Sequence, residues 1–310
     1  MPPKIKVMKY TLVIADNQDQ ESFDRGLPYE KFLLGSQNAS APLELQSQGV
    51  TVGSNTCVAR IEPVHIHAAR DHLVLTSTQI LDIQASEADA LFDSVKDIFL
   101  EMSDVTHRSM PHKWFIESSA LDTLSTVSTA QAEGRNIDHW MPSDTSTEGV
   151  ARQWRKWQNE IQMIWFNHPV NEARQAKGML SINSIWISGN GKLADIKPDA
   201  RLLQAKQWHS SDGCLNLLAS HLQKSHVTSL NELFWNDAIS LLSVSDPALQ
   251  LIWQQACEAL TNHQIKEIEL IDFPEGQERS QTITIEQLPK KGFALWKKPV
   301  VGSLQDMLRR

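Results

Sequence analysis

The sequence predicts an α/β protein in which mixed sheets are flanked by helices. Runs with a two-residue apolar period, typical of strands, are interspersed along the chain with runs whose apolar residues recur every three or four positions, typical of helices. Strands and helices mixed in this way bury their apolar faces by packing as layers. With 310 residues, 41% apolar and 21% charged, the chain fits a soluble globular protein of one large or two smaller domains.

In the first half of the chain, each expected element has a local signal. Alternating Val64, Ile66 and Ala68 predict a strand with one buried face, and AARDH supplies the turn of a hairpin. Ser86 is expected to cap the helix that follows, whose apolar residues form one stripe. The elements expected in order are a strand at 5–15, a helix at 27–36, a polar loop at 37–55 that can hold a short helix, a hairpin at 57–77, a helix at 86–102, a strand at 113–117 and a loop at 121–149.

The second half begins with a tryptophan-rich helix. It is expected to start near Thr145, in a capping box with Glu148, and to stop at Pro169. The elements expected after it are a short helix from Asn171 to Gly178, a strand at 182–188 with a turn at 189–191, a strand at 202–207, a helix at 211–222, helices at 229–243 and 246–262, and a hairpin of strands at 266–273 and 281–288.

A polar segment, NHPVNEARQAKGMLSINSIWISGNG at 167–191, is the candidate ligand site. An arginine fork suits a carboxylate or phosphate, Asn and His supply neutral hydrogen bonds, and glycines let the backbone approach an anion. The alternative is that these residues cap helix ends and lock a turn. The candidate ligand-binding residues are His168, Asn171, Arg174, Asn183, Gly189 and Gly191.

Composition excludes several other classes of function. A net charge of −8 argues against a broad nucleic-acid-binding face, and the cluster of Arg152, Arg155 and Lys156 is interpreted as a solvated helix face. No apolar stretch approaches a membrane span. Three widely separated cysteines without a CxxC argue against disulfides and structural zinc, and favour the cytoplasm.

Metal ligands have few candidates in the sequence. His65 and His67 share one face of a predicted strand, as a zinc-binding pair would, but a third ligand is not evident and a solvated strand face is the alternative. The sequence has no phosphate-binding P-loop, no G-x-S-x-G elbow and no H-E-x-x-H motif. No cofactor is therefore expected.

The segment from Asn159 to Gly191 resembles the archaeal-type cofactor-independent phosphoglycerate mutases. Its residues match the pattern HPVN-x-x-R-x-x-x-G-x-x-x-x-N followed by a strand ending in G-x-G, and 58–102 resembles the start of that family's inserted domain. The segments PVHIHAARDHLVLT (63–76), GRNIDHWMP (134–142) and SDGCLNLLASHL (211–222) further resemble a proteobacterial group of Rpf-type regulatory or phosphoglycerate-mutase-like proteins. The resemblance covers roughly 25–290.

The resemblance implies a shortened alkaline-phosphatase-like core at 1–56 and 190–310, with an inserted α/β domain at 57–189. Such enzymes use two metal ions, held by Asp and His from several strand ends, and a Ser or Thr nucleophile. Here Asp16 follows the first strand without the usual glycine, and the D-x-x-x-H and D-H clusters of the last third are missing. Asp16 thus joins His65 and His67 as a metal candidate only, and whether any catalysis remains is open.

We therefore expect a diverged, non-catalytic bacterial relative with a regulatory role, which binds an anionic small molecule or a protein partner at the 168–191 edge. An active manganese- or zinc-dependent phosphomutase or phosphatase is the first alternative, and a pure protein-interaction module is the second. The sequence does not give the ligand or the oligomeric state.

Overall fold

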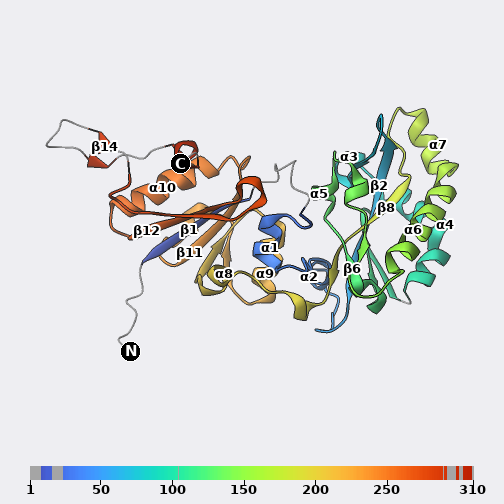
Figure 1. Cartoon of the computed structure of the whole chain (residues 1–310), viewed down its shortest axis with the longest axis horizontal. Coiled ribbons are helices and arrows are strands. Elements are labelled where there is room, and N and C mark those ends of the chain that lie inside the picture. The colour runs from blue at the N-terminus through green and yellow to red at the C-terminus, as the bar shows by residue number, and fades with distance from the viewer. Residues whose placement is uncertain are drawn as a thin grey trace. The chain divides into compact units, whose positions relative to one another are not determined.

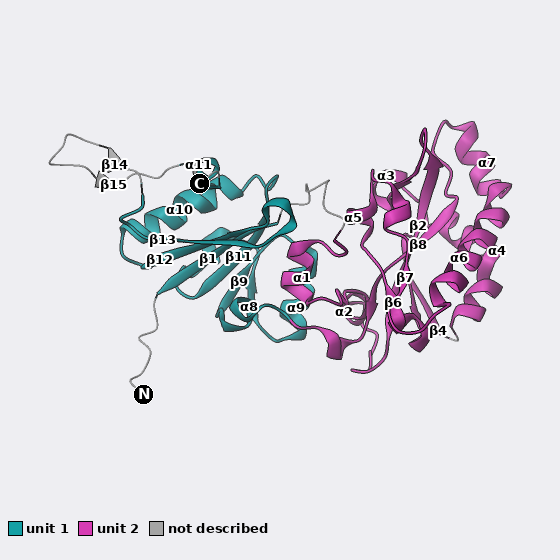
Figure 2. Ribbon diagram, viewed as in Figure 1, with its two compact units in different colours: residues 1–22, 198–310 teal, residues 23–197 magenta. Residues whose placement is uncertain are grey.

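The computed structural model of the chain describes residues 8–15, 24–103, 105–288, 290–291, 298–299 and 303–308. It divides into two compact units, one made of Met1–Ser22 with Pro198–Arg310 and the other of Phe23–Lys197 (Figure 2). The second unit is a continuous stretch that interrupts the first. These divisions differ from the expected ones after residues 56 and 189, because Ala41 and Leu45 pack in one cluster with Val58 and Phe115.

The first unit is built on a six-stranded sheet in the order β10-β9-β11-β1-β12-β13, parallel except for β13 (Figure 1). The central strands β1 and β11 are apolar on both faces, as helix-covered parallel strands are. Its strands are β1 (Lys9–Ala15), β9 (Gln207–His209), β10 (Ser225–Val227), β11 (Ala238–Ser243), β12 (Glu267–Asp272), β13 (Arg279–Ile283), and a separate pair, β14 (Lys290–Lys291) and β15 (Lys298–Pro299).

Helices lie on both faces of this sheet. Ile252 and Trp253 of α10 pack against Tyr10 and Leu12 of β1, and Figure 1 shows α8 and α9 on the other side. The helices of this unit are α8 (Ala200–Gln204), α9 (Gly213–His221), α10 (Leu249–Thr261) and α11 (Leu304–Leu308), with 3-10 turns η4 (Leu230–Glu232) and η5 (Pro274–Gly276).

The second unit is organised around one long strand, β2, which pairs antiparallel with β3, β5 and β8. The predicted hairpin at 57–77 is confirmed by the β2–β3 pairing. The strands of this unit are β2 (Val58–Ala68), β3 (Leu73–Thr76), β4 (Val105–Met110), β5 (Lys113–Glu117), β6 (Leu124–Ser125), β7 (Ser143–Asp144) and β8 (Ser184–Gly191).

The helices of the second unit bury single apolar stripes. Trp154, Trp157 and Trp165 of α6 join the main core, which α4 shares. In the described part of the chain no helix is both long and apolar enough to cross a membrane. The helices are α1 (Pro28–Leu34), α2 (Ala41–Ser47), α3 (Thr78–Leu81), α4 (Ala85–Met102), α5 (Thr129–Ala132), α6 (Val150–Phe166) and α7 (Pro169–Ala176), with 3-10 turns η1 (Ser119–Thr123), η2 (Ile137–His139) and η3 (Leu193–Asp195).

Several helix ends differ from the predicted ones. Gln84, not Ser86, caps α4, because the Glu87 carboxylate reaches back to the Gln84 N–H at 3.0 Å. Likewise α6 begins at Val150 after Gly149, later than the expected Thr145 start. His168, not Asn171, caps α7, which places Pro169 at its first position, where the missing N–H costs nothing.

Two elements of the first unit have the wrong predicted type. The first half of the expected strand at 202–207 is the end of helix α8, which Asp199 caps by accepting from the N–H of Arg201 at 2.8 Å, and the strand β9 begins only at Gln207. The expected helix at 229–243 contains the central strand β11. The predicted turn at 189–191 is also wrong in type, because these residues continue β8 and Gly191 pairs with Val58.

Candidate functional site

The HPVN segment begins with His168, the N-cap of α7. Its imidazole Nδ1 accepts the N–H of Val170 at 3.3 Å. Partial burial holds the pKa of His168 below its usual value, so the ring is neutral at pH 7 and remains a hydrogen-bond acceptor. The residue therefore has a structural role in the helix start.

Asn171 is 1% exposed and ties α7 to the residue before β8. Its Nδ2 donates to the carbonyls of Trp165 at 2.8 Å and Ile182 at 2.7 Å, and its Oδ1 accepts the N–H of Ile182 at 2.7 Å. These contacts use both amide hydrogens and one acceptor position.

Arg174 is also 1% exposed. Its guanidinium donates to Glu87 at 2.7 Å and to the carbonyls of Leu81 at 2.5 Å and Leu180 at 2.7 Å. All three nitrogens thus have partners inside the protein. An anion would have to displace these partners before it could reach the guanidinium.

The remaining residues of the segment contact backbone. Asn183 Oδ1 accepts the N–H of Ile66, and its Nδ2 donates to the carbonyl of Ile66, both at 2.8 Å. Gly189 has φ +63, and a Cβ there would lie 3.1 Å from the Ala41 nitrogen. A Cβ on Gly191 would lie 2.7 Å from the Ala39 Cβ. The two glycines let β8 pass close to the start of α2.

The six predicted residues thus lie along one continuous segment, which consists of α7, the 180–183 connection and β8. Their polar groups hold α3, α4, β2 and α6 together rather than converge on a shared space. The structural alternative accounts for the contacts of every one of them. Ligand binding by these residues stays a prediction.

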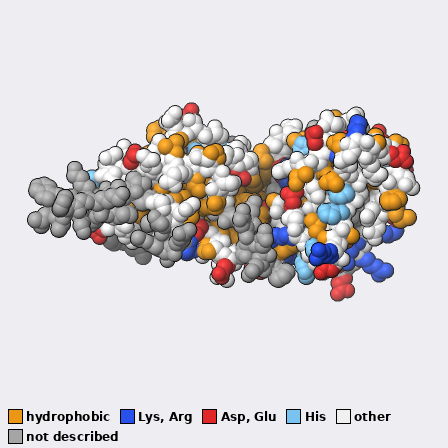
Figure 3. All heavy atoms as spheres, turned by 90° about the horizontal axis from the view of Figure 1, so that it is seen from above, with side chains coloured by type: hydrophobic (Ala, Val, Ile, Leu, Met, Phe, Trp, Pro, Cys, Tyr) orange, Lys and Arg blue, Asp and Glu red, His pale blue; other side chains and the backbone are white. Residues whose placement is uncertain are grey.

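Two of the three candidate metal ligands, His65 and His67, lie within the described residues. Asp16 falls outside the described residues. His65 and His67 share a strand face, with ring centroids 5.5 Å apart, and Nδ1 of His65 lies 2.8 Å from the Ser181 carbonyl oxygen. Figure 3 shows histidine side chains on one face of the second unit. Among the described residues no group of three His, Cys, Asp or Glu is placed to hold a metal ion.

Ligands of open α/β sheets bind beyond the carboxyl ends of the parallel strands, which in the first unit carry polar residues. His209 Nδ1 lies 3.1 Å from Ser240 Oγ. Asp246 accepts from Ser211 Oγ at 2.9 Å and from the N–H of Ala248 at 2.8 Å. These carboxylate and hydroxyl groups are engaged in local turns, and the described residues of this edge do not fit a two-metal centre.

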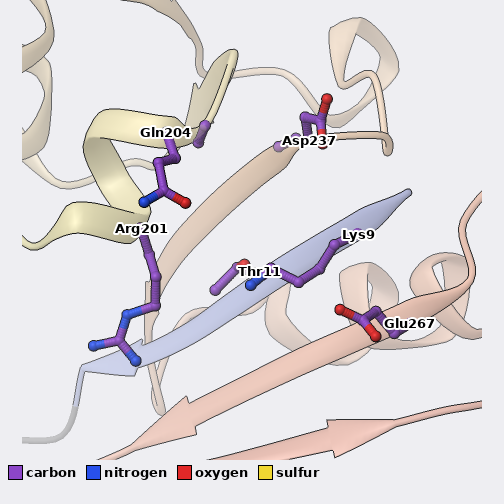
Figure 4. A pocket seen from close by; sticks show the side chains of 8 residues that line it. Lys9, Thr11, Arg201, Gln204, Asp237 and Glu267 are labelled. Atoms are coloured by element: carbon purple, nitrogen blue, oxygen red, sulfur yellow. The ribbon is translucent and has the colours of Figure 1, made fainter. Parts of the chain in front are cut away.

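A small pocket of about 210 Å³ lies at the opposite, amino end of β1, β11 and β12 (Figure 4). Three of its four charged lining residues, Lys9, Arg201 and Asp237, form ion pairs within the protein. Lys9 contacts Glu269 at 2.7 Å, and Arg201 contacts Asp199 at 2.7 Å and Glu278 at 2.8 Å. These ion pairs leave the pocket without a dominant charge for a ligand.

A cavity of about 680 Å³ lies in the second unit. This is within the range of small-molecule sites. Polar lining residues come from one flank of α6, namely Arg155, Gln158, Asn159 and Gln162, and Ser184 adds the first residue of β8. The Arg155 side chain is exposed and has no ion pair or hydrogen bond among the described residues.

Ser184 differs from the other polar residues of the cavity because it is 1% exposed. Its hydroxyl has no hydrogen-bond partner in the part of the chain that the structure describes. A buried polar group without a partner costs about 1–3 kcal/mol. A ligand that reaches this hydroxyl would recover that free energy.

Arg25 shapes one side of the cavity. Its guanidinium donates to the carbonyls of Ser125 at 3.0 Å, Trp140 at 3.2 Å and Met141 at 2.9 Å. Burial lowers the pKa of Arg25, and its Nε has no partner within the described residues. Arg25 thus holds the 139–142 loop and lines the same cavity as Arg155.

The sequence alone does not predict this cavity, because its charge pattern places Arg155 on a solvated helix face. The available signal was the spacing of Arg155, Gln158, Asn159 and Gln162, which places four hydrogen-bonding side chains on one flank of a helix. The spacing alone does not show what that flank borders.

Residues 38–171 match the family model described as 2,3-bisphosphoglycerate-independent phosphoglycerate mutase. A curated relative, a probable 2,3-bisphosphoglycerate-independent phosphoglycerate mutase from Geobacter sulfurreducens, is 25% identical over 157 residues. That match covers 49% of this chain and 37% of the relative, so it spans little more than a third of the relative's length. The predicted resemblance to these mutases is confirmed, whereas membership of the Rpf-type group stays a prediction.

Two solved structures align with 90% of this chain. One is a cofactor-independent phosphoglycerate mutase from Thermoplasma acidophilum, with 12% identity, a TM-score of 0.37 and 90% of its own chain covered. The other is a protein from Pyrococcus horikoshii, with 11% identity, a TM-score of 0.39 and 88% covered. Both scores are below 0.5, and the α/β fold with mixed sheets rests on the strands and helices described above.

Proposed function

Because residues 38–171 are related to the 2,3-bisphosphoglycerate-independent phosphoglycerate mutases, we propose that this protein is a diverged, non-catalytic relative with a regulatory role. In this proposal it binds an anionic small molecule in the cavity of the second unit. The observation that carries the proposal is that Ser184, whose buried hydroxyl has no partner among the described residues, lines the same cavity as Arg155, which has no ion pair among them.

The charge and hydrogen-bonding groups of the cavity favour an anion. Arg155 offers a planar fork of donors for a carboxylate or phosphate. The amides of Asn159 and Gln162 and the hydroxyl of Ser184 supply neutral hydrogen bonds beside it. Asp138 is the one acidic residue among the lining residues described, and its side chain is exposed.

A binding role rather than phosphoryl transfer is supported by the donor set of the first unit. Phosphoryl transfer in the mutase family requires two metal ions. Described carboxylates at the carboxyl edge of the sheet already have partners within the unit, since Asp212 accepts the N–H of Leu215 at 3.0 Å and Asp272 forms an ion pair with Arg279. We therefore derive no metal-dependent step for this chain.

The proposal is tested by calorimetric titration with 3-phosphoglycerate and other phosphorylated and carboxylated metabolites. Charge-assisted hydrogen bonds contribute about 1.5–3 kcal/mol, so Arg155→Ala is expected to weaken binding by about tenfold or more. Arg152→Ala is the matched control, because Arg152 is exposed on the same helix but does not line the cavity. Equal affinity of the wild type and Arg155→Ala would show that the anion binds elsewhere.

Two other outcomes favour the alternatives. Turnover of 3-phosphoglycerate that depends on manganese or zinc would make the protein an active phosphomutase or phosphatase. No binding of any anion, together with a protein partner whose affinity is unaffected by Arg155→Ala, would make it an interaction module.

A further inference from the structure

The cavity of the second unit has an apolar part as well as a polar part. Ile66 and Ala68 of β2 and Leu73 of β3 line it, and Met141 and Pro142 of the loop held by Arg25 continue this lining. These five side chains are apolar, so they offer no hydrogen-bond partner to the hydroxyl groups of a sugar-like ligand. The polar residues of α6 therefore favour a hydrogen-bonding group of the ligand, whereas the apolar residues of the hairpin favour a hydrocarbon group.

The apolar part is an extension of the core. Ile66 pairs with Leu75 and Ala68 pairs with Leu73 across the β2–β3 ladder, so these four side chains share one face of the hairpin. Leu75 is 1% exposed, whereas Leu73 is 41% exposed. The apolar face thus continues beyond the residues that cover it and reaches the cavity.

Ser184 belongs to the same side of the sheet. It pairs with Val64, which lies two residues before Ile66 on β2 and so points to the same face. The unpartnered hydroxyl therefore lies at the boundary between the apolar hairpin face and the polar flank of α6. A ligand that spans this boundary needs a hydrogen-bonding head and an apolar body.

We infer that the ligand is an amphipathic anion, with a carboxylate or phosphate head and a short hydrocarbon body, rather than a fully hydroxylated phosphosugar acid. This inference rests on the proposed function, because it assigns the head to Arg155 and Ser184. It adds that the body covers Ala68 and Leu73.

The test is a calorimetric series of straight-chain carboxylates from propionate to octanoate, with 3-phosphoglycerate measured alongside. Burial of a methylene contributes about 0.8 kcal/mol, so affinity is expected to rise by about two- to fourfold per added carbon in this half-open cavity. The rise should stop once the apolar lining is covered. A constant affinity across the wild-type series overturns the inference without any variant.

Variants locate the effect. Leu73→Asn is expected to reduce the increment per carbon, so that octanoate loses more affinity than propionate, whereas Arg155→Ala should weaken every member by the same factor. Met163→Gln is the matched control, because Met163 is 77% exposed on α6 and does not line the cavity. A loss of the increment in Met163→Gln would place the hydrocarbon outside the cavity and overturn the inference.

The remaining outcomes separate the two proposals. Binding of 3-phosphoglycerate together with a carboxylate series of constant affinity overturns the amphipathic ligand and leaves the proposed anion site in place. No binding of any carboxylate or phosphate overturns both. Binding of octanoate that Arg155→Ala leaves unchanged also overturns the inference, because the head would then lie away from α6.

Discussion

Asn171 bonds the backbone of Ile182 in both directions, donating to its carbonyl and accepting its N–H, each at 2.7 Å. The side chain thereby acts as a one-residue strand partner for the chain that enters β8. Since both residues are almost fully buried, water cannot replace either bond.

Asn171→Asp is expected to destabilise the protein by about 2–4 kcal/mol, because the carbonyls of Trp165 and Ile182 lose their donor and face a carboxylate. Urea unfolding at pH 7 measures the change. Asn167→Asp is the matched control at an exposed position, for which we expect a loss below about 1 kcal/mol. Equal losses in the two variants would contradict the structural role of Asn171.

Arg174→Met is expected to cost about 2–4 kcal/mol of unfolding free energy, because Glu87 and two carbonyls lose their donor while the volume is nearly kept. Exposed Arg152→Met should change it by less than about 0.5 kcal/mol. A stable Arg174→Met protein that has lost affinity for 3-phosphoglycerate would instead support the ligand role first predicted for this residue.

A comparison of alanine variants at Gly189 and Gly178 distinguishes the cost of backbone strain from the cost of steric crowding. Both have positive φ, +63 and +72, but a Cβ on Gly178 meets nothing within 4 Å. A Cβ on Gly189 would lie 2.3 Å from Ser40 Oγ and 3.1 Å from the Ala41 nitrogen. Thermal unfolding should therefore show that Gly189→Ala costs about 1–3 kcal/mol more than Gly178→Ala. Similar losses would mean that α2 can move away from β8.

Ser184 and Ser188, both on β8, should respond in opposite ways to replacement by alanine. Ser184→Ala removes a buried hydroxyl without a described partner, so the ligand-free protein should keep or gain stability, by up to about 1 kcal/mol. Ser188 Oγ accepts from Arg60 at 2.8 Å and donates to Glu62 at 3.3 Å, so Ser188→Ala should cost about 1–3 kcal/mol. Destabilisation by Ser184→Ala without ligand would indicate that its hydroxyl is already satisfied.

His209 should make stability depend on pH. Burial, and then the neighbouring His226, hold its pKa below the ordinary value, while Asp246 opposes the shift. The unfolded chain therefore binds a proton more readily, and this contribution to stability is present above about pH 6.5 and lost as pH falls through the lower, folded pKa. The slope for one such proton is at most about 1.4 kcal/mol per pH unit.

His209→Asn is expected to flatten the dependence of unfolding free energy on pH between 7 and 5. His263→Asn is a control, because His263 is an exposed histidine on the same unit. Parallel profiles for wild type and His209→Asn would show that the histidine titrates alike in the folded and unfolded states.

Much of the fold follows from periodicity in the sequence. The alternation from Val64 to Ala68 correctly predicted the hairpin, and the stripe of α4 correctly predicted that helix. β11 was missed because AISLLS is buried along almost its whole length, and a central parallel strand has no two-residue period. A helix and such a strand have similar apolar runs, so only their neighbours in the sheet distinguish them.

The candidate site was harder to predict because its residues are distant in sequence. Arg25, Leu73, Met141, Arg155 and Ser184 come from five separate segments. The HPVN segment, by contrast, concentrates its polar residues locally, and the structure shows these contacts bonding backbone nearby. The concentration of polar residues in this short segment therefore indicates a junction of helices and strands. The cavity, by contrast, forms only when segments distant in sequence pack together.

Because the second unit is inserted between β1 and β9, β1 is synthesised long before the strands that pair with it. Tyr10 of β1 pairs with Ala238 of β11, a separation of 238 − 10 = 228 residues. At about 5–20 residues per second, a ribosome needs roughly 10–45 s to make that interval. The second unit, whose strands and helices are contiguous, is complete within this delay, whereas the apolar strand at the centre of the first unit waits for its neighbours. β1 therefore stays unpaired for longer than any strand of the second unit. We expect chaperones to bind the apolar residues 9–15 during this interval.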